Sequence, residues 1–175
     1  MRVSFDLDEV LFVDPKRFEI EPPPRGLAGI FYKERLRKGT VELMHRLQSE
    51  GFEIWVYTSS YRSVQYITNL FRQYDIRFDG IVNAQRHERE VQREHRQRLP
   101  QKMPSYFRIS LHIDDEENIV RSSRSFGFRS LKVCEPDDQW AEKVFNEAVR
   151  IRELEGRQKE MRSRARKEYL AGEAK

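Results

Sequence analysis

Two aspartates near the start of the chain have the residue type and spacing of a cation-binding pair. Asp6 and Asp8 close an apolar segment, residues 3–7, that has the composition of a buried strand. Side chains two positions apart in an extended segment point to the same side, so we expect both carboxylates to face one cleft. Two such charges repel each other unless a cation or a shared proton lies between them. Oxygen ligands of this kind favour magnesium.

Two polar features further along the chain suit a phosphoryl group. Thr58, with Ser59 behind it, ends the apolar segment 53–58, and a hydroxyl followed by a backbone N–H can hold phosphoryl oxygens. Lys102 lies in a polar stretch, where a lysine can neutralise the charge of a phosphate and of a nucleophile.

A second acidic pair, Asp114 and Asp115, directly follows the apolar segment 109–113. Two carboxylates at the end of a strand would complete a cation site. The histidines show no metal-ligand spacing, and we interpret all four as structural: His45, His87, His95 and His112.

Short apolar segments alternate with amphipathic stretches, and these elements must position the polar residues. The segments rich in β-branched and aromatic residues are predicted strands: 3–7, 53–58, 80–82, 109–113 and 131–133. Helical periodicity occurs at 41–47, 64–74, 119–123 and from about Asp138 onward. This alternation predicts a three-layer, Rossmann-like α/β fold with a mainly parallel five-stranded sheet and helices on both faces. In such sheets, functional residues gather at the carboxyl ends of the strands.

Taken in order, these features resemble the motifs of the haloacid dehalogenase-like (HAD) superfamily over nearly the whole core. Its first motif, an apolar strand ending in Asp-x-Asp, is matched by Asp6 and Asp8. Its second motif, a strand ending in Thr or Ser, is matched by Thr58, and its third, a lone lysine, by Lys102. Its fourth motif, a strand ending in paired Asp, is matched at 114–115. The resemblance implies a magnesium-dependent phosphatase that hydrolyses a phosphomonoester.

The resemblance also implies roles for the first two motifs. Asp6 would be the nucleophile that forms an aspartyl-phosphate. Asp8 would protonate the leaving oxygen and then activate water, and its backbone carbonyl would bind magnesium. Thr58 would orient the phosphoryl group, and Ser59 would help to bind the substrate. Asp8 points to phosphatase chemistry, because dehalogenases of the superfamily lack this aspartate and ion pumps carry threonine there; Glu9 departs from the glycine of many members.

The remaining two motifs complete the implied site. Lys102 would balance the charge around Asp6 and the phosphate. Asp114 would ligate magnesium directly or through water, with Asp115 supporting Asp114 or Lys102. The implied magnesium ligands are therefore Asp6, Asp8, Asp114 and Asp115.

Two other functions can be weighed against a phosphatase. A catalytically silent HAD-like domain would bind phosphorylated or anionic partners, but such a domain has no need to keep both Asp6 and Asp8. A response-regulator receiver would carry its acidic pair after the first strand and its phosphorylated aspartate after the third. The third predicted strand ends in Val82-Asn83, so we reject the receiver.

The motifs leave little room for a further domain. We expect a catalytic domain at residues 1–155 and a charged helical extension at 156–175. Within the domain, residues 14–38 contain three consecutive prolines and are predicted to form an irregular flap. Neither gap between motifs could hold a folded cap, so the resemblance is closest to uncapped phosphatases. An open site would suit a bulky substrate, or a site closed by another subunit.

Composition limits the partners and the compartment. A net charge of +4 and a pI of about 9.2 indicate a mild bias toward anionic partners, below that of a typical nucleic-acid binder. The segment 86–98 is arginine-rich and could recognise an anion, although three glutamates dilute it. The single cysteine, Cys134, is interpreted as an inert core thiol and permits no internal disulfide. We expect a soluble, cytoplasmic protein that acts on a phosphorylated small molecule or macromolecule; nucleic-acid binding and oligomerisation stay open.

Overall fold

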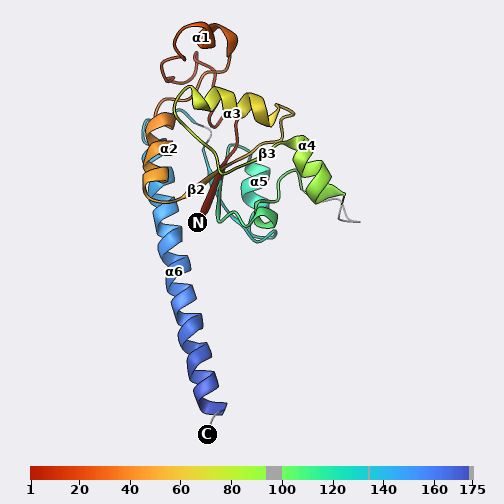
Figure 1. Ribbon diagram of the computed structural model, residues 1–175, viewed down its shortest axis with the longest axis vertical. Helices are drawn as coiled ribbons and strands as arrows, with labels where there is room; N and C mark the ends of the chain where they lie inside the picture. Colours follow the sequence, from red (N-terminus) through yellow and green to blue (C-terminus); the bar gives the residue numbers. More distant parts are fainter. Residues whose placement is uncertain (94–99, 134, 174–175) are drawn as a thin grey trace.

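The computed structural model describes residues 1–93, 100–133 and 135–173 (Figure 1). Cys134 lies outside the described residues, as do His95 and the part of the arginine-rich segment at 94–99. The interpretations of these residues therefore stay predictions.

A five-stranded sheet forms the centre of the molecule. Its strand order is β3-β2-β1-β4-β5, and every pairing between neighbours is parallel. The strands are β1 (Arg2–Phe5), β2 (Glu53–Tyr57), β3 (Gly80–Val82), β4 (Leu111–Asp114) and β5 (Arg129–Lys132). The predicted three-layer α/β fold with a parallel sheet is confirmed.

The register of the sheet brings three of the predicted motifs together. Phe5 is paired with Val56 on β2 and with Ile113 on β4. The next residue, Asp6, still donates its backbone N–H to the carbonyl of Ile113 at 2.9 Å. Because β1 lies between β2 and β4, the ends of these three strands meet at one edge of the sheet.

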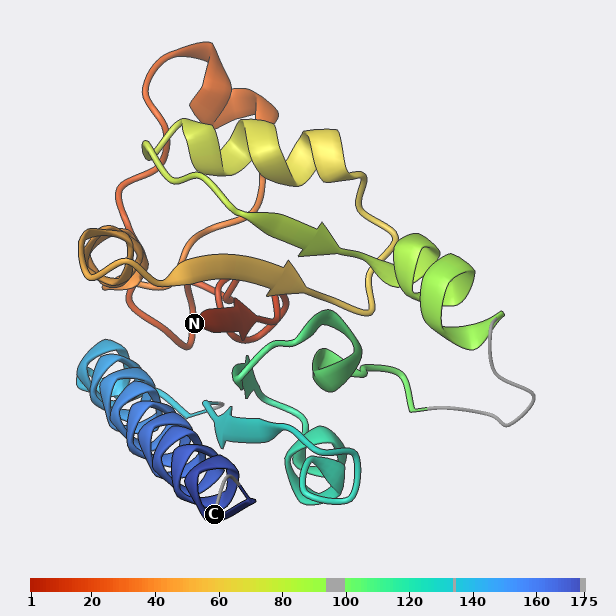
Figure 2. The same ribbon diagram turned by 60° about the horizontal axis from the view of Figure 1, so that its bottom comes forward.

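Alternating side chains of β2 pack into two separate cores, one on each face of the sheet. Ile54 and Val56 belong to the larger core, which includes the buried sides of α2 (Thr40–Ser49), α3 (Val64–Arg72) and α6 (Trp140–Glu173). Figure 2 shows α3 lying along β2 and β3. Trp55 and Tyr57 belong to the smaller core. Apolar burial on both faces of a parallel sheet is the arrangement expected for a doubly covered fold.

Shorter helical elements line the smaller core and its surroundings. They are α4 (Ala84–His87) with a π-helical turn (Glu88–Gln92), a 3-10 turn (Pro104–Phe107) and α5 (Glu117–Ser122). The π-helical turn contributes Val91 and the 3-10 turn contributes Phe107 to the smaller core.

The segment 14–38 folds back along the chain with little regular structure. Its one helix is α1 (Leu27–Phe31), and isolated bridges join Phe12 to Leu36 and Ile20 to Arg37. Tyr32 and Leu36 are buried and anchor the segment to the larger core.

The last helix, α6, has two parts of different character. Trp140, Val144, Ala148 and Ile151 pack into the larger core, as their spacing predicts. The helix then continues through Gly156 to Glu173, and the side chains at 157–170 are exposed. None of the helices in the described ranges combines the length and the apolar character needed to cross a membrane.

Candidate functional site

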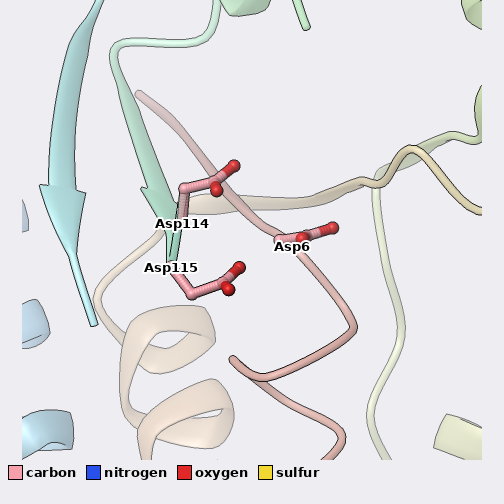
Figure 3. Close-up of side chains that lie close together, drawn as sticks. All are labelled: Asp6, Asp114 and Asp115. Carbon is pink, nitrogen blue, oxygen red and sulfur yellow. The ribbon is translucent and has the colours of Figure 1, made fainter. Parts of the chain in front are cut away.

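Three aspartates meet where β1 and β4 end. Asp6 follows β1, Asp114 is the last residue of β4, and Asp115 follows it. One carboxylate oxygen from each lies within 4.8 Å of the others, and Figure 3 shows the three side chains close together. Asp6 and Asp114 are buried and Asp115 is half-buried. This spacing allows one small cation to contact all three carboxylates.

Lys102 lies between two of these carboxylates. Its Nζ atom is 3.0 Å from Asp6 Oδ2 and 2.7 Å from Asp114 Oδ2, and the lysine side chain is fully buried. Burial alone would lower the pKa of Lys102, but the charges of Asp6 and Asp114 outweigh burial and raise it. The lysine is therefore held in its charged form beside Asp6.

A hydrogen bond from the neighbouring backbone fixes the segment that carries Lys102. The N–H of Met103 donates to the hydroxyl of Tyr57 at 2.8 Å. That hydroxyl also lies 2.5 Å from Nδ1 of His87. Burial lowers the pKa of His87 below its usual value. The buried Tyr57 thus links the end of β2 to the lysine segment, a role that sequence reasoning missed.

His112 supports Asp114 from beneath the site. Its Nε2 is 2.7 Å from Asp114 Oδ2 and its Nδ1 is 2.8 Å from Ser4 Oγ. Burial alone would raise the pKa of Asp114, but the hydrogen bonds and charges of His112 and Lys102 lower it to about 2. We had interpreted His112 as only structural, whereas it contacts a candidate ligand. The alternation of β4, which puts His112 and Asp114 on one face, is the signal that could have identified it.

The acidic group has more negative charge than its protein partners balance. Three carboxylates face one lysine. Burial, together with the charges of Asp114 and Asp6, raises the pKa of Asp115 to about 6. Asp6 Oδ1 is buried and has no hydrogen-bond partner within the described residues. A buried carboxylate oxygen of this kind is unfavourable unless a ligand contacts it, and a hard divalent cation fits this donor set.

Asp8 lies outside this group and forms contacts of its own. Its half-exposed carboxylate accepts a hydrogen bond from Arg62 Nη1 at 2.8 Å. Arg62 Nε also binds Glu34 of the segment 14–38 at 3.2 Å, and Tyr66 donates to the same glutamate. Although burial opposes it, the bonds from Tyr66 and Arg62 lower the pKa of Glu34. The network ties the segment 14–38 to the loop that follows β2.

The remaining candidate residues lie at the end of β2. Thr58 is buried, its N–H donates to the carbonyl of Val82 at 2.9 Å, and its Oγ1 accepts from the N–H of Ser60 at 3.2 Å. Ser59 is exposed. Thr58 therefore lies at the same edge of the sheet as Asp6.

Of the arginines of the 86–98 segment that the structure describes, Arg86 and Arg89 have intramolecular side-chain contacts, and Arg93 is exposed. Arg86 binds Glu90 at 3.0 Å and the carbonyl of Ile81 at 2.9 Å, and Arg89 binds Glu90 at 2.7 Å. A groove of about 1300 Å³ lies elsewhere, between the base of the segment 14–38 and the start of α6, and contains none of the candidate residues.

Comparisons with known proteins support the fold alone. No protein-family model matches the chain, and no curated protein matches it. A crystal structure of an uncharacterized protein from Listeria monocytogenes serotype 4b is similar, with a TM-score of 0.55 and 16% sequence identity. The similarity covers 87% of this chain and 99% of the Listeria protein.

Proposed function

We propose that the protein is a magnesium-dependent phosphatase that hydrolyses a phosphomonoester through an aspartyl-phosphate on Asp6. The observation that carries this proposal is the buried, unpartnered Oδ1 of Asp6, which lies in a group with Asp114 and Asp115. The order of the four motifs, which resembles that of the HAD superfamily, supports transfer of a phosphoryl group to Asp6 as the reaction.

Asp6, Asp114 and Asp115 would hold the magnesium ion, and the resemblance adds the backbone carbonyl of Asp8. A divalent cation would offset negative charge of the three carboxylates that Lys102 alone does not balance. The bound ion would supply charge stabilisation for the transferring phosphoryl group.

Side chains of the protein would carry out the remaining steps of the reaction. Lys102 binds Asp6 Oδ2 at 3.0 Å, which fixes the rotation of the carboxylate and leaves Oδ1 free for a ligand. A carboxylate oxygen of Asp6 would form a bond to phosphorus while the bond from phosphorus to the leaving oxygen breaks. Asp8 would protonate that oxygen and then take a proton from the water that hydrolyses the aspartyl-phosphate. Because Arg62 holds the Asp8 carboxylate, this ion pair must open during turnover.

A silent domain that binds phosphorylated or anionic partners is the alternative. It would also use Lys102 and the cation, and would account equally for the buried Oδ1 of Asp6, but such a domain has no need to keep both Asp6 and Asp8. A cytoplasmic location belongs to the same proposal, because a single cysteine suits a reducing compartment.

The test is phosphate release by the full chain from p-nitrophenyl phosphate, in magnesium or in EDTA. The magnesium concentration should be about 100 times the dissociation constant of the site. We expect release only with magnesium, and we expect Asp6→Asn to abolish it. Asp138→Asn, the same chemical change at an exposed position, is the matched control and should keep full activity. A panel of sugar phosphates, nucleotides, phosphopeptides and nucleic-acid ends would then define the substrate. Magnesium binding without release from any of these substrates would favour the silent domain.

A further inference from the structure

The net positive charge of the chain is concentrated in its last nineteen residues. Residues 157–175 contain seven Lys or Arg and three Glu, which gives them a net charge of +4. The whole chain, with 33 basic and 29 acidic residues, also has a net charge of +4. Residues 1–156 are therefore balanced; three of the four net positive charges belong to residues 157–173 of α6, and the fourth is Lys175.

This part of α6 extends away from the rest of the molecule (Figure 1). The last contacts of the helix with the body are made by Arg152, which binds Glu50, and by Glu155, which binds Ser110 and Arg129. Glu50 and Ser110 precede β2 and β4, so α6 leaves the body at the amino edge of the sheet. The aspartate group lies at the opposite, carboxyl edge, so a partner on the extended part would leave that site open.

The basic side chains on the extended helix divide between two faces. Arg157, Arg164 and Lys167 share a face with glutamates 160 and 168, and Arg157 lies 3.6 Å from Glu153. Arg157 and Arg164 each have glutamates three or four positions away that offset their charges, whereas Lys167 has none.

The other face has no such neutralisation. Lys159, Arg162 and Arg166 are spaced i, i+3 and i+7, which places them within about 60° of one another around the helix axis. Arg162 and Arg166 have no acidic residue three or four positions away. Lys159 has Glu155, but Arg129 and Ser110 already bind that carboxylate. In the described ranges, no ion pair involves any of these three basic residues, which we call the basic face.

We propose that the basic face binds the phosphate backbone of double-stranded nucleic acid and tethers the protein to it. The three charges span about 10 Å of helix at 1.5 Å per residue, and a duplex presents one negative charge per about 1.7 Å of its axis. The partner is therefore recognised by a regular array of phosphates and not by base sequence. The inference does not depend on the proposed phosphatase activity.

The apolar side chains of the extended helix argue against a bilayer as the partner. A helix that lies on a membrane presents a broad apolar face with Trp, Phe or Leu opposite its basic face. Here Met161, Ala165 and Tyr169 form a stripe beside the basic face, and the exposed Leu170 lies next to Lys159 around the helix axis, so the apolar residues do not form one broad face. That stripe offers little area for insertion, whereas long exposed lysine and arginine side chains are sufficient for phosphate contacts.

Salt dependence gives the expected size of the effect. Three phosphate contacts release about three counterions, so the logarithm of the association constant should fall with the logarithm of salt with a slope of about −2.7. Raising salt from 50 to 200 mM should then weaken binding about 40-fold.

The test measures binding of a fluorescent 20-base-pair duplex (about two helical turns) to the full chain by anisotropy at several salt concentrations. One variant carries Lys159→Gln, Arg162→Gln and Arg166→Gln. The matched control carries Arg157→Gln, Arg164→Gln and Lys167→Gln, which removes the same number of charges from the face that also carries glutamates 160 and 168. We expect the first variant to lose binding and its salt slope, while the control keeps both. Circular dichroism should show equal helix content in both variants.

Four results would overturn the proposal. Equal losses in the two variants would mean that net charge alone attracts the duplex. Absence of duplex binding by the unmodified chain at 50 mM salt would show that nucleic acid is not the partner. Binding to vesicles with anionic lipid, without binding to the duplex, would assign the basic face to a membrane. Self-association that depends on the basic face, measured by sedimentation, would assign it to a second copy.

Discussion

Replacing Asp115 by asparagine should stabilise the protein when magnesium is absent. The substitution keeps the shape of the side chain and removes one of the three negative charges that face Lys102. Moving the pKa of Asp115 from 3.8 to about 6 corresponds to about 3 kcal/mol for a fully buried carboxyl. Solvent screening of this half-buried side chain reduces that figure to about 1.5 kcal/mol. A gain of this size should raise the Tm by about 3–6 °C.

The sign of this effect depends on pH and on magnesium. The folded protein binds the Asp115 proton more tightly than the unfolded chain does, so its stability falls as pH rises from about 4 to about 6. The gain from Asp115→Asn should therefore be full at pH 7.5 and absent near pH 4. With magnesium the order reverses, because the unmodified protein gains about 2.7 kcal/mol at 100 times the dissociation constant while the variant has lost a ligand.

Thermal unfolding at pH 7.5, in EDTA and in magnesium, measures both effects. Asp138→Asn is the control, since that exposed carboxylate lies outside the acidic group and its removal should change the Tm by less than about 1 °C. The reasoning fails if Asp115→Asn lowers the Tm in EDTA, or if magnesium stabilises the variant and the unmodified protein equally.

Three further perturbations test the surrounding contacts. Lys102→Met leaves the buried carboxylates of Asp6 and Asp114 without their cation, so urea unfolding in EDTA should show a loss of about 3–5 kcal/mol that magnesium partly restores; a loss below 1 kcal/mol would contradict this. The lowered pKa of Asp114 stabilises the protein above pH 4, and about 2 kcal/mol of stability should disappear as pH falls from 3.8 toward 2, but not in Asp114→Asn. Arg62→Gln releases Glu34, so hydrogen exchange in residues 14–38 should accelerate about fivefold, the equivalent of about 1 kcal/mol; unchanged exchange would show that other contacts hold the segment.

The strands could be predicted from the sequence because most of them contain a short apolar run, but several of their ends could not. The predicted segment 109–113 begins earlier than β4, which starts at Leu111. Ile109 donates its N–H to the carbonyl of Pro104, within the turn that precedes the strand, and Ser110 donates to the carbonyl of Arg2. Apolar composition cannot distinguish a residue buried in a turn from one buried in a strand, since Ile109 in the turn and Leu111 in the strand are both buried.

The polar layer beneath the site was not predictable by searching for ligand spacing. Alternation along β4 places His112 on the face of Asp114, but its second partner follows from the pairing of β4 with β1, which aligns His112 with Ser4. That pairing provides the hydrogen bond from which the imidazole reaches Asp114. Sequence alone gives the alternation along one strand, whereas the partner of a buried histidine depends on which strand lies beside it.

Asp8 lies beyond the end of β1, where side chains no longer alternate between the two faces of the sheet. This position suits the proposed role of Asp8, in which its carboxylate moves during the reaction. Strand β1 ends at Phe5, and the carbonyl of Leu7 then accepts from the N–H groups of Leu11 and Phe12, with Glu9 at a φ of 59°. In this turn, a spacing of two residues no longer keeps Asp8 beside Asp6.

The consequence is a site with one fixed part and one exchangeable part. Asp6 is held by a buried lysine, and breaking a buried pair is strongly unfavourable. Asp8 is held by Arg62 at a half-exposed position, where an ion pair contributes at most about 1 kcal/mol. If Asp6 is the nucleophile, its attacking oxygen stays in place between turnovers. The carboxylate of Asp8 can then move from Arg62 to the leaving oxygen at a small cost in free energy. The ion pair with Glu34 keeps Arg62 in position, so that Asp8 can bind it again after the reaction.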